Sequence, residues 1–182
     1  MLILASQSPR RKELLKKIVP EFLIMPADVD EHLNVDPYAL PMEAAYLKAM
    51  TIFKDHPNDE VLGSDTVVIV DGELFGKPKD ENDAYRMLKT WSGRDHDVVS
   101  GYAYVSKQKT IKGSTKTVVH FNKLSDETIW KYIKTGSPLD KAGAYGVQDN
   151  DRFPIVKKVT GSMSNVIGFP VDEIKEEFMK MQ

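Results

Sequence analysis

Seven residues near the N-terminus, Ser6-Gln7-Ser8-Pro9-Arg10-Arg11-Lys12, combine two serine hydroxyls with three consecutive cations. Ser8 is a favourable helix N-cap, and Pro9 suits the first helical position. Cations oppose the dipole at the N-terminus of a helix, so helix stability alone would favour acidic residues there. The stretch therefore indicates a site for an anion such as phosphate, the alternative being a capped helix whose basic residues face water.

Three other stretches could take part in the same chemistry. Asp65, in Gly63-Ser64-Asp65-Thr66 ahead of an apolar strand, could bind Mg²⁺ or activate water, although such an aspartate also suits a turn. Lys77, in a loop, could reach a phosphate oxygen, or it could simply be solvated. Gln148 ends a glycine-containing loop and could read the edge of a base, because its amide both donates and accepts hydrogen bonds.

Several other functional classes find no support in the sequence. The chain has no P-loop, no G-x-G-x-x-G and no G-x-S-x-G, and the absence of Cys removes thiolate nucleophiles and Cys-based metal sites. The histidines lack metal-ligand spacing, and an acidic patch could be solvated surface or a metal ligand set. These residues are His32, His56, His96 and His120, and Asp28, Asp30 and Glu31.

The residues named above must be positioned by strands and helices. These alternate along the whole chain, and this alternation predicts the α/β class. Apolar and β-branched runs predict strands near 2–5, 22–25, 66–70, 73–75, 97–106, 114–121 and 155–159. Helical spacing and capping residues predict helices over 8–19, over 42–53 with Lys48 off the apolar stripe, from an Asp80 cap to Trp91, from a Ser125 cap to Gly136, and after Pro170.

Length and charge narrow the class of protein further. The 182 residues suit one domain, or at most two small ones. Because 25 Lys and Arg face 27 Asp and Glu, no basic excess exists to bind a nucleic-acid backbone. The chain contains no apolar run near the roughly 18 residues of a membrane helix and no basic signal-peptide start. We therefore expect a cytoplasmic protein that binds neither nucleic acid nor membrane.

Together these stretches closely resemble the Maf family of nucleoside triphosphate pyrophosphatases. Six motifs occur in the family's order and run across nearly the whole chain. They are Leu4-Ala5-Ser6-Gln7-Ser8-Pro9-Arg10-Arg11, Gly63-Ser64-Asp65-Thr66-Val67-Val68, Gly76-Lys77-Pro78, Ser92-Gly93-Arg94-Asp95-His96, Lys141-Ala142-Gly143-Ala144-Tyr145-Gly146-Val147-Gln148 and Asn165-Val166-Ile167-Gly168-Phe169-Pro170.

The resemblance implies a fold and a reaction. It implies one domain over residues 1–182, an elongated mixed sheet flanked by helices with a central cleft, related to the inosine-triphosphate pyrophosphatases. Whether two lobes border the cleft, and whether the protein is a homodimer, stays open. The implied reaction cleaves nucleoside triphosphates between the α and β phosphates, with Mg²⁺ or Mn²⁺, to a monophosphate and pyrophosphate.

The resemblance also implies residue roles. Asp65 matches the general base, and Glu31, together with Asp65, the metal-associated position. Substrate-binding positions match Ser6, Arg10, Arg11, Lys48 and Lys77, and specificity positions match Arg11, Thr66 and Gln148.

The loop that ends at Gln148 resembles the branch of the family that acts on dTTP and UTP. The chain departs from the family at Ser64, where Ala is usual, at Asp149, where Gly is common, and at Met163-Ser164, which replaces an aromatic pair. A nucleotide-binding regulator linked to septum formation, with little catalysis, and a metal-dependent phosphatase of another kind are the alternative functions.

Overall fold

A mixed β-sheet flanked by helices organises the computed structural model, which describes residues 1–181. The strands are β1 (Leu2–Ala5), β2 (Leu23–Ile24), β3 (Glu60–Val70), β4 (Glu73–Phe75), β5 (Asp95–Val105), β6 (Thr110–Phe121) and β7 (Val156–Thr160). Their order is β2-β1-β3-β5-β6-β7, and β4 pairs with β3. β1 is parallel to β2 and β3, whereas β4 and β7 are antiparallel to their partners. The predicted α/β class is confirmed.

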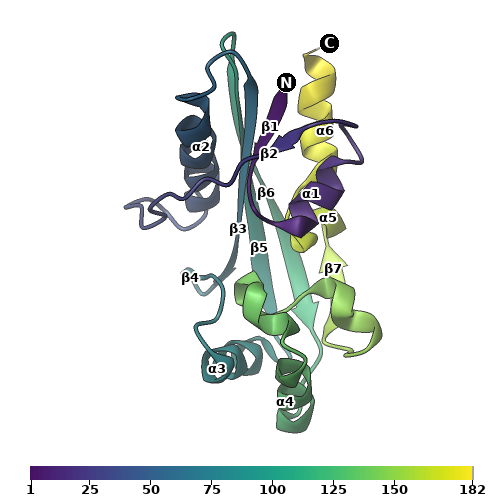
Figure 1. The fold of residues 1–182 in the computed structure, drawn as a ribbon. Coiled ribbons are helices and arrows are strands. Elements are labelled where there is room, and N and C mark those ends of the chain that lie inside the picture. Colours follow the sequence, from purple (N-terminus) through teal and green to yellow (C-terminus); the bar gives the residue numbers. More distant parts are fainter. Residues whose placement is uncertain (182) are drawn as a thin grey trace. The chain divides into compact units, whose positions relative to one another are not determined.

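The helices follow the predicted order along the chain (Figure 1). They are α1 (Pro9–Leu15), α2 (Leu40–Phe53), α3 (Glu81–Trp91), α4 (Asp126–Lys134), α5 (Met163–Ile167) and α6 (Val171–Lys180), with short 3₁₀ turns over Ser137–Asp140, Ala142–Ala144 and Val147–Asp151. None of the helices within residues 1–181 has the length and apolar character needed to cross a membrane.

The chain divides into two units. The first comprises Met1–Thr66, Ser100–Thr115 and the segment from Gly168 onward, and the second comprises Val67–Val99 and Lys116–Ile167. Strands β3, β5 and β6 contribute residues to both units.

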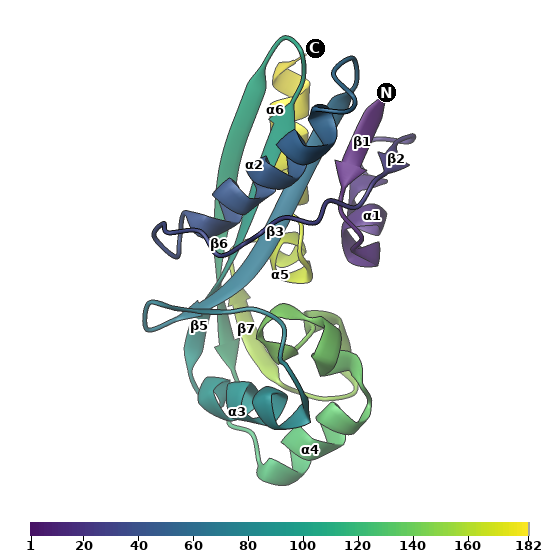
Figure 2. The same cartoon turned by 60° about the vertical axis from the view of Figure 1, so that its left-hand side comes forward.

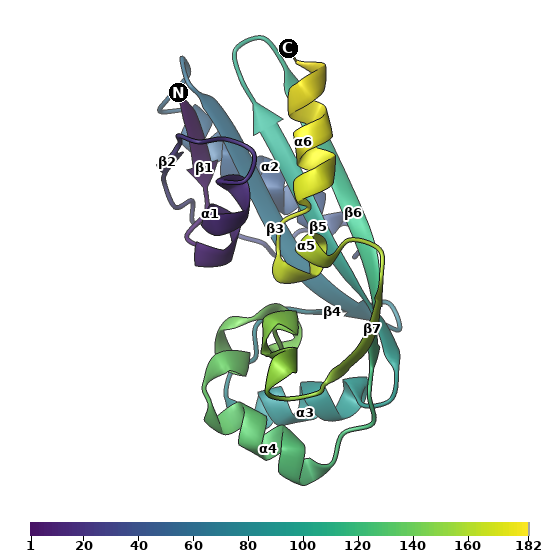
Figure 3. The same ribbon diagram turned by 90° about the vertical axis from the view of Figure 1, so that its right-hand side faces the viewer.

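In the first unit, α2 lies on one face of the sheet, and α1 and α6 lie on the other (Figures 1 and 3). Alternation along β5 produces this arrangement, because successive side chains of a strand point to opposite faces. Ala103 and Val105 join a core with alanines of α2, whereas the ring of Tyr104 lies 5.8 Å from that of Phe178 on α6.

Glycines and alanines let α2 approach the sheet closely. Ala45 and Ala49 of α2 are fully buried against it. A Cβ at Gly63 of β3 would lie 2.2 Å from the carbonyl oxygen of Ala45, and one at Gly101 of β5 would lie 2.2 Å from the backbone nitrogen of Met42. These two positions therefore set how near the helix that carries Lys48 comes to the strand that carries Asp65.

We expect Gly63→Ala to lower the free energy of unfolding by about 1–3 kcal/mol, the usual cost of an overpacked core, because backbone atoms of α2 would have to move. Urea denaturation would measure the change. Gly76→Ala is the matched control, since nothing lies within 4 Å of a Cβ built there. A Gly63→Ala protein as stable as this control would contradict the close approach.

The second unit is built around Trp91 and the pair α3 and α4, which lie side by side (Figure 2). The Trp91 indole donates a hydrogen bond of 2.7 Å to the carbonyl of Gly143, and its ring makes an edge contact with Phe75. Gly143 has a φ of 72°, and a Cβ there would lie 2.6 Å from a methyl group of Val68. Only a glycine fits this position, which fixes the loop that leads to Gln148.

His96 belongs to the core of this unit and is 4% exposed. Its Nε2 lies 2.7 Å from the Tyr145 hydroxyl, and within residues 1–181 its Nδ1 has no hydrogen-bond partner. Burial lowers the pKa of the His96 imidazole to about 3, with a smaller opposing effect of Asp95. His96 is therefore a neutral residue of the core at neutral pH.

The depressed pKa of His96 predicts a loss of stability in acid. Between about pH 6.5 and pH 3 the unfolded chain binds a proton at this imidazole and the folded chain does not, so stability falls as pH falls through that window. We expect His96→Gln, which does not titrate, to lose less stability than the wild type between neutral pH and about pH 5. Urea midpoints at the two pH values would test this. Equal losses in both proteins would contradict it.

The predicted elements agree closely with the structure, apart from several boundaries and short elements. The Asp80 and Ser125 caps are present, with side chains that accept from the backbone N–H of Asp83 and Thr128. Helix α1 ends at Leu15 instead of near residue 19, and β3 begins at Glu60 instead of residue 66 because Gly63, Ser64 and Asp65 are extended. The short α5 and the 3₁₀ turns were not predicted.

Candidate active site

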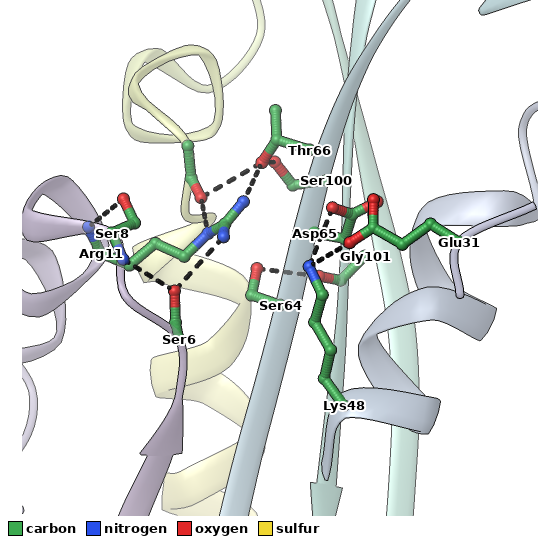
Figure 4. Close-up of polar contacts among 11 residues, drawn as sticks. Ser6, Ser8, Arg11, Glu31, Lys48, Ser64, Asp65, Thr66, Ser100 and Gly101 are labelled. Carbon is green, nitrogen blue, oxygen red and sulfur yellow. Dashed lines mark hydrogen bonds and ion pairs between the residues drawn. The ribbon is translucent and has the colours of Figure 1, made fainter. Parts of the chain in front are cut away.

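Strand β3 presents two neighbouring polar residues on opposite faces of the sheet. Asp65 points toward α2, and Thr66 points toward α1 (Figure 4). The parallel register of β1 with β3 ends at Ala5, opposite Gly63, so both residues lie beyond the carboxyl end of β1. Ligands of α/β proteins bind at the carboxyl ends of parallel strands. A ligand at this end of β1 could reach side chains of both faces.

On the α2 face, Lys48 joins two carboxylates. Its Nζ lies 3.2 Å from Asp65 Oδ1 and 2.9 Å from Glu31 Oε1 (Figure 4). The side chains of Lys48 and Asp65 are 12% and 10% exposed, whereas that of Glu31, in the loop before α2, is 47% exposed. The structure therefore brings together the predicted base, the predicted metal-associated residue and one predicted substrate-binding lysine.

The buried position of Asp65 changes its acidity. Burial, the largest effect, raises the pKa of the Asp65 carboxyl above its ordinary value, and Glu31 adds to this increase. Lys48 and Arg11 oppose it with their positive charges. A carboxylate whose pKa is raised is a better proton acceptor, and such a shift is typical of functional sites.

On the opposite face, the Arg11 guanidinium contacts three separate segments. Its Nε donates to the carbonyl of Gly168 at 2.9 Å, its Nη2 to Thr66 Oγ1 at 3.1 Å and its Nη1 to Ser6 Oγ at 3.4 Å. Burial lowers the pKa of Arg11, whereas the nearby negative charge of Asp65 raises it. Arginine keeps its charge in proteins, so Arg11 is a partly buried cation whose orientation is fixed by these three contacts.

The contacts of Thr66 determine the direction of its hydrogen bonds. Its Oγ1 lies 3.2 Å from the carbonyl oxygen of Gly168, which can only accept, so Thr66 donates there. It then accepts from Arg11, which can only donate, and from Ser100 Oγ at 2.7 Å. Ser100 is fully buried on β5. The Thr66 hydroxyl thus uses its donor and both acceptor positions within the protein.

We expect Thr66→Val to lower the free energy of unfolding by about 1–3 kcal/mol, the cost of leaving buried partners without a hydrogen bond, although the shape is preserved. Thr51→Val is the matched control, because Thr51 is an exposed residue of α2 whose hydroxyl bonds its own helix at Leu47. Urea denaturation of both variants would measure the difference. A Thr66→Val protein no less stable than the control would show that this network adds nothing to the fold.

Ser6 and Ser8 shape the start of α1. Ser8 Oγ accepts from the backbone N–H of Arg11 at 3.3 Å, which confirms the predicted N-cap. Ser6 is 7% exposed, and its Oγ accepts from the backbone N–H of Ser8 at 3.1 Å. Arg10, also on α1, is partly exposed. Of the three consecutive cations, Arg10 and Arg11 are therefore both partly shielded from solvent.

Lys77 and Gln148 lie in the second unit, and both side chains are exposed. A hydrogen bond of 3.0 Å from the Gly143 N–H to the Gly76 carbonyl connects the two loops that carry them. The structure therefore joins the Lys77 loop to the Gln148 loop, while Asp65, Lys48, Glu31, Arg11, Ser6 and Thr66 form the cluster of the first unit.

Asp149, a departure from the family pattern, fixes the loop beside Gln148. Its Oδ2 accepts from the Tyr132 hydroxyl at 2.7 Å and from Ser137 Oγ at 2.6 Å. The Tyr132 hydroxyl in turn accepts from the backbone N–H of Gly146 at 2.9 Å. Partial burial works to raise the pKa of Asp149, but these two hydrogen bonds and nearby cations outweigh it and lower the pKa.

Three residues that position the cluster had no role assigned to them from the sequence. Ser100 contacts Thr66, and Ser64 donates to the Gly101 carbonyl at 2.9 Å, which explains a hydroxyl where Ala is usual. The carbonyl of Gly168 accepts from Arg11 and Thr66, and its φ of 130° favours glycine. Gly168 lies in a quoted motif, so a signal existed for it. Ser64 also lies in a quoted motif, but its partner on β5 could not be read from it. Ser100 acts through a contact with another strand and gave no local signal.

Comparison with known proteins identifies the family to which this arrangement belongs. A family model described as Maf-like protein matches residues 1–181, and the chain belongs to the Maf family. The chain is 45% identical over 174 residues to a dTTP/UTP pyrophosphatase of Thermococcus gammatolerans, covering 96% of this chain and 93% of that protein. The corresponding protein of Thermosipho africanus is 46% identical, with 95% and 89% covered.

A further relative comes from another organism. The dTTP/UTP pyrophosphatase of Geotalea uraniireducens is 42% identical over 184 residues, covering 99% of this chain and 94% of that protein. Among solved structures, protein VC0702 from Vibrio cholerae aligns with 74% of this chain and about two thirds (66%) of its own, at 13% identity and a TM-score of 0.38. That score is too low to show a shared fold.

Proposed function

We propose that this protein hydrolyses nucleoside triphosphates, dTTP and UTP among them, between the α and β phosphates, to a nucleoside monophosphate and pyrophosphate with the help of a divalent cation. One observation carries the proposal: a buried carboxylate of raised pKa, Asp65, lies next to Lys48 and Glu31 beyond the end of β1. Membership of the Maf family, whose relatives above are named dTTP/UTP pyrophosphatases, supports the substrate class.

The proposed chemistry begins with water. Asp65 accepts a proton from a water molecule whose oxygen adds to phosphorus, and the bond from that phosphorus to the oxygen bridging the α and β positions breaks. The monophosphate and pyrophosphate are the two products. Cations stabilise the charge that the phosphates carry and the leaving pyrophosphate gains. Lys48 and Arg11 are the cations next to Asp65, and Arg10 and Lys77 are proposed to contribute as well.

A divalent cation fits the residues present, although they form an incomplete ligand set. No group of three or more His, Cys, Asp or Glu side chains suited to a metal occurs among residues 1–181, but Asp65 and Glu31 share one lysine. Mg²⁺ is commonly held by one or two carboxylates, with waters and substrate phosphates completing the shell. Asp65 and Glu31 would hold it, and when bound it would neutralise phosphate charge and acidify water.

For base recognition we propose that Arg11 and Thr66 act as a pair, in which the fully bonded Thr66 hydroxyl holds Arg11 in position. Each already holds the other, so neither side chain must be ordered when a nucleotide binds. Gln148 lies in a loop fixed through Gly143, and its exposed amide is proposed to contact the pyrimidine. The Asp149 network would hold that loop in place.

We expect Asp65→Asn to keep the fold and lose about 10²–10⁴-fold in kcat, the usual range for loss of a general base. The measurement is incubation with Mn²⁺ and dTTP, UTP, CTP, ATP or 7-methyl-GTP, with both products resolved by chromatography. Asp55→Asn, the same change at an exposed residue just after α2, is the control and should retain full activity. Near-normal turnover by Asp65→Asn would remove Asp65 from its proposed role.

The products separate the alternatives. Monophosphate plus pyrophosphate from dTTP and UTP is the expected result. Orthophosphate would indicate a phosphatase of another kind, and turnover of 7-methyl-GTP alone would overturn the proposed role of Gln148. Binding of nucleotides without turnover would favour a nucleotide-binding regulator.

A further inference from the structure

The ammonium group of Lys48 occupies the position between two carboxylates that are proposed to hold a divalent cation. It contacts one oxygen of each, Oδ1 of Asp65 at 3.2 Å and Oε1 of Glu31 at 2.9 Å (Figure 4). The Lys48 side chain is 12% exposed, so the ammonium is largely withdrawn from water. A buried ammonium is stable when it is paired, and these two contacts provide the pairing.

The same two oxygens cannot serve the ammonium and a divalent cation equally well. Oxygen ligands bind Mg²⁺ at about 2.0–2.1 Å, and two cations a few ångströms apart in a poorly hydrated site repel strongly. Arg11 adds to this repulsion, because its charge interacts with both Asp65 and Glu31 from the opposite face. The free protein therefore presents a pair of carboxylates already neutralised by its own cation.

The ammonium group of Lys48 can also move away from the two carboxylates. Its helix is fixed against the sheet by Ala44, Ala45 and Ala49, but the side chain is an unbranched stem that can rotate without moving that helix. A triphosphate at the end of β1 would offer the ammonium new anionic partners. Lys48 can thus exchange carboxylate oxygens for phosphate oxygens.

We infer that Lys48 competes with the divalent cation for Asp65 and Glu31, and that it transfers to a substrate phosphate when the cation binds. The inference rests on the proposed function, since it takes the metal and the triphosphate from there. It predicts that the protein without nucleotide binds the metal weakly. It also means that Lys48 binds first the two carboxylates and then a phosphate, whereas the sequence predicted phosphate binding alone.

Direct titration of the nucleotide-free protein with Mn²⁺ tests the competition, with the free ion measured by electron paramagnetic resonance. We expect Lys48→Met to bind Mn²⁺ about tenfold more tightly than the wild type, equivalent to about 1.4 kcal/mol, because the competing charge is gone. Lys48→Gln should behave in the same way and serves if Lys48→Met does not fold. Lys54→Met removes a lysine of equal charge at the exposed end of α2 and should leave the affinity unchanged.

The outcomes separate this inference from the proposed function. A folded Lys48→Met or Lys48→Gln protein that binds Mn²⁺ no more tightly than the wild type, or not at all, overturns the competition, even if the wild type cleaves dTTP. Tighter binding in the Lys48 variants, with Lys54→Met unchanged, supports it, even if no nucleotide is hydrolysed. An equal gain in Lys54→Met also overturns it, because the effect would then come from net charge.

Discussion

Alternation of side chains along β3 is the constraint on which the candidate site depends. Asp65 and Thr66 are adjacent, so the geometry of a strand sends them to opposite faces of the sheet. Each face then supplies its own partners, Lys48 and Glu31 from the α2 side and Arg11, Ser100 and the Gly168 carbonyl from the other. The two sets lie beyond the carboxyl end of β1 because β1 ends at Ala5, opposite Gly63.

Close packing of α2 turns that alternation into an ion-pair cluster. Lys48 reaches Asp65 because α2 lies directly against strand backbone that carries no side chain, with Ala45 and Ala49 over Gly63. The start of the same helix, at Met42, lies over Gly101. On the other face, hydrogen bonds hold the residues in place. Arg11 donates to Thr66, and both side chains donate to the carbonyl of Gly168. One half of the site is held by the approach of a helix, and the other half by the pairing of donors and acceptors.

Most elements of the fold, and several members of the cluster, were predictable from sequence, and the misses share a cause. Capping residues such as Asp80 and Ser125 act on their own helices, so local sequence located these two helix starts. The start of β3 was misjudged because Gly63-Ser64-Asp65 also suits a turn, and pairing with β1 makes this stretch part of the strand. Ser100 and Ser64 matter through contacts between strands, which no local pattern records. The pairing of Lys48 with Glu31, likewise, joins a loop to a helix.

The hydrogen bond from Arg11 to Gly168 connects residues 157 positions apart, and this separation bears on how the protein is made. The first unit draws on three segments of the chain, the last of which begins at Gly168. During synthesis from the N-terminus, all residues of the second unit therefore precede the segment that completes the first. Closing so long a loop is slow compared with forming local contacts. The Arg11 side of the candidate site is consequently among the last parts of the protein that can reach their final arrangement.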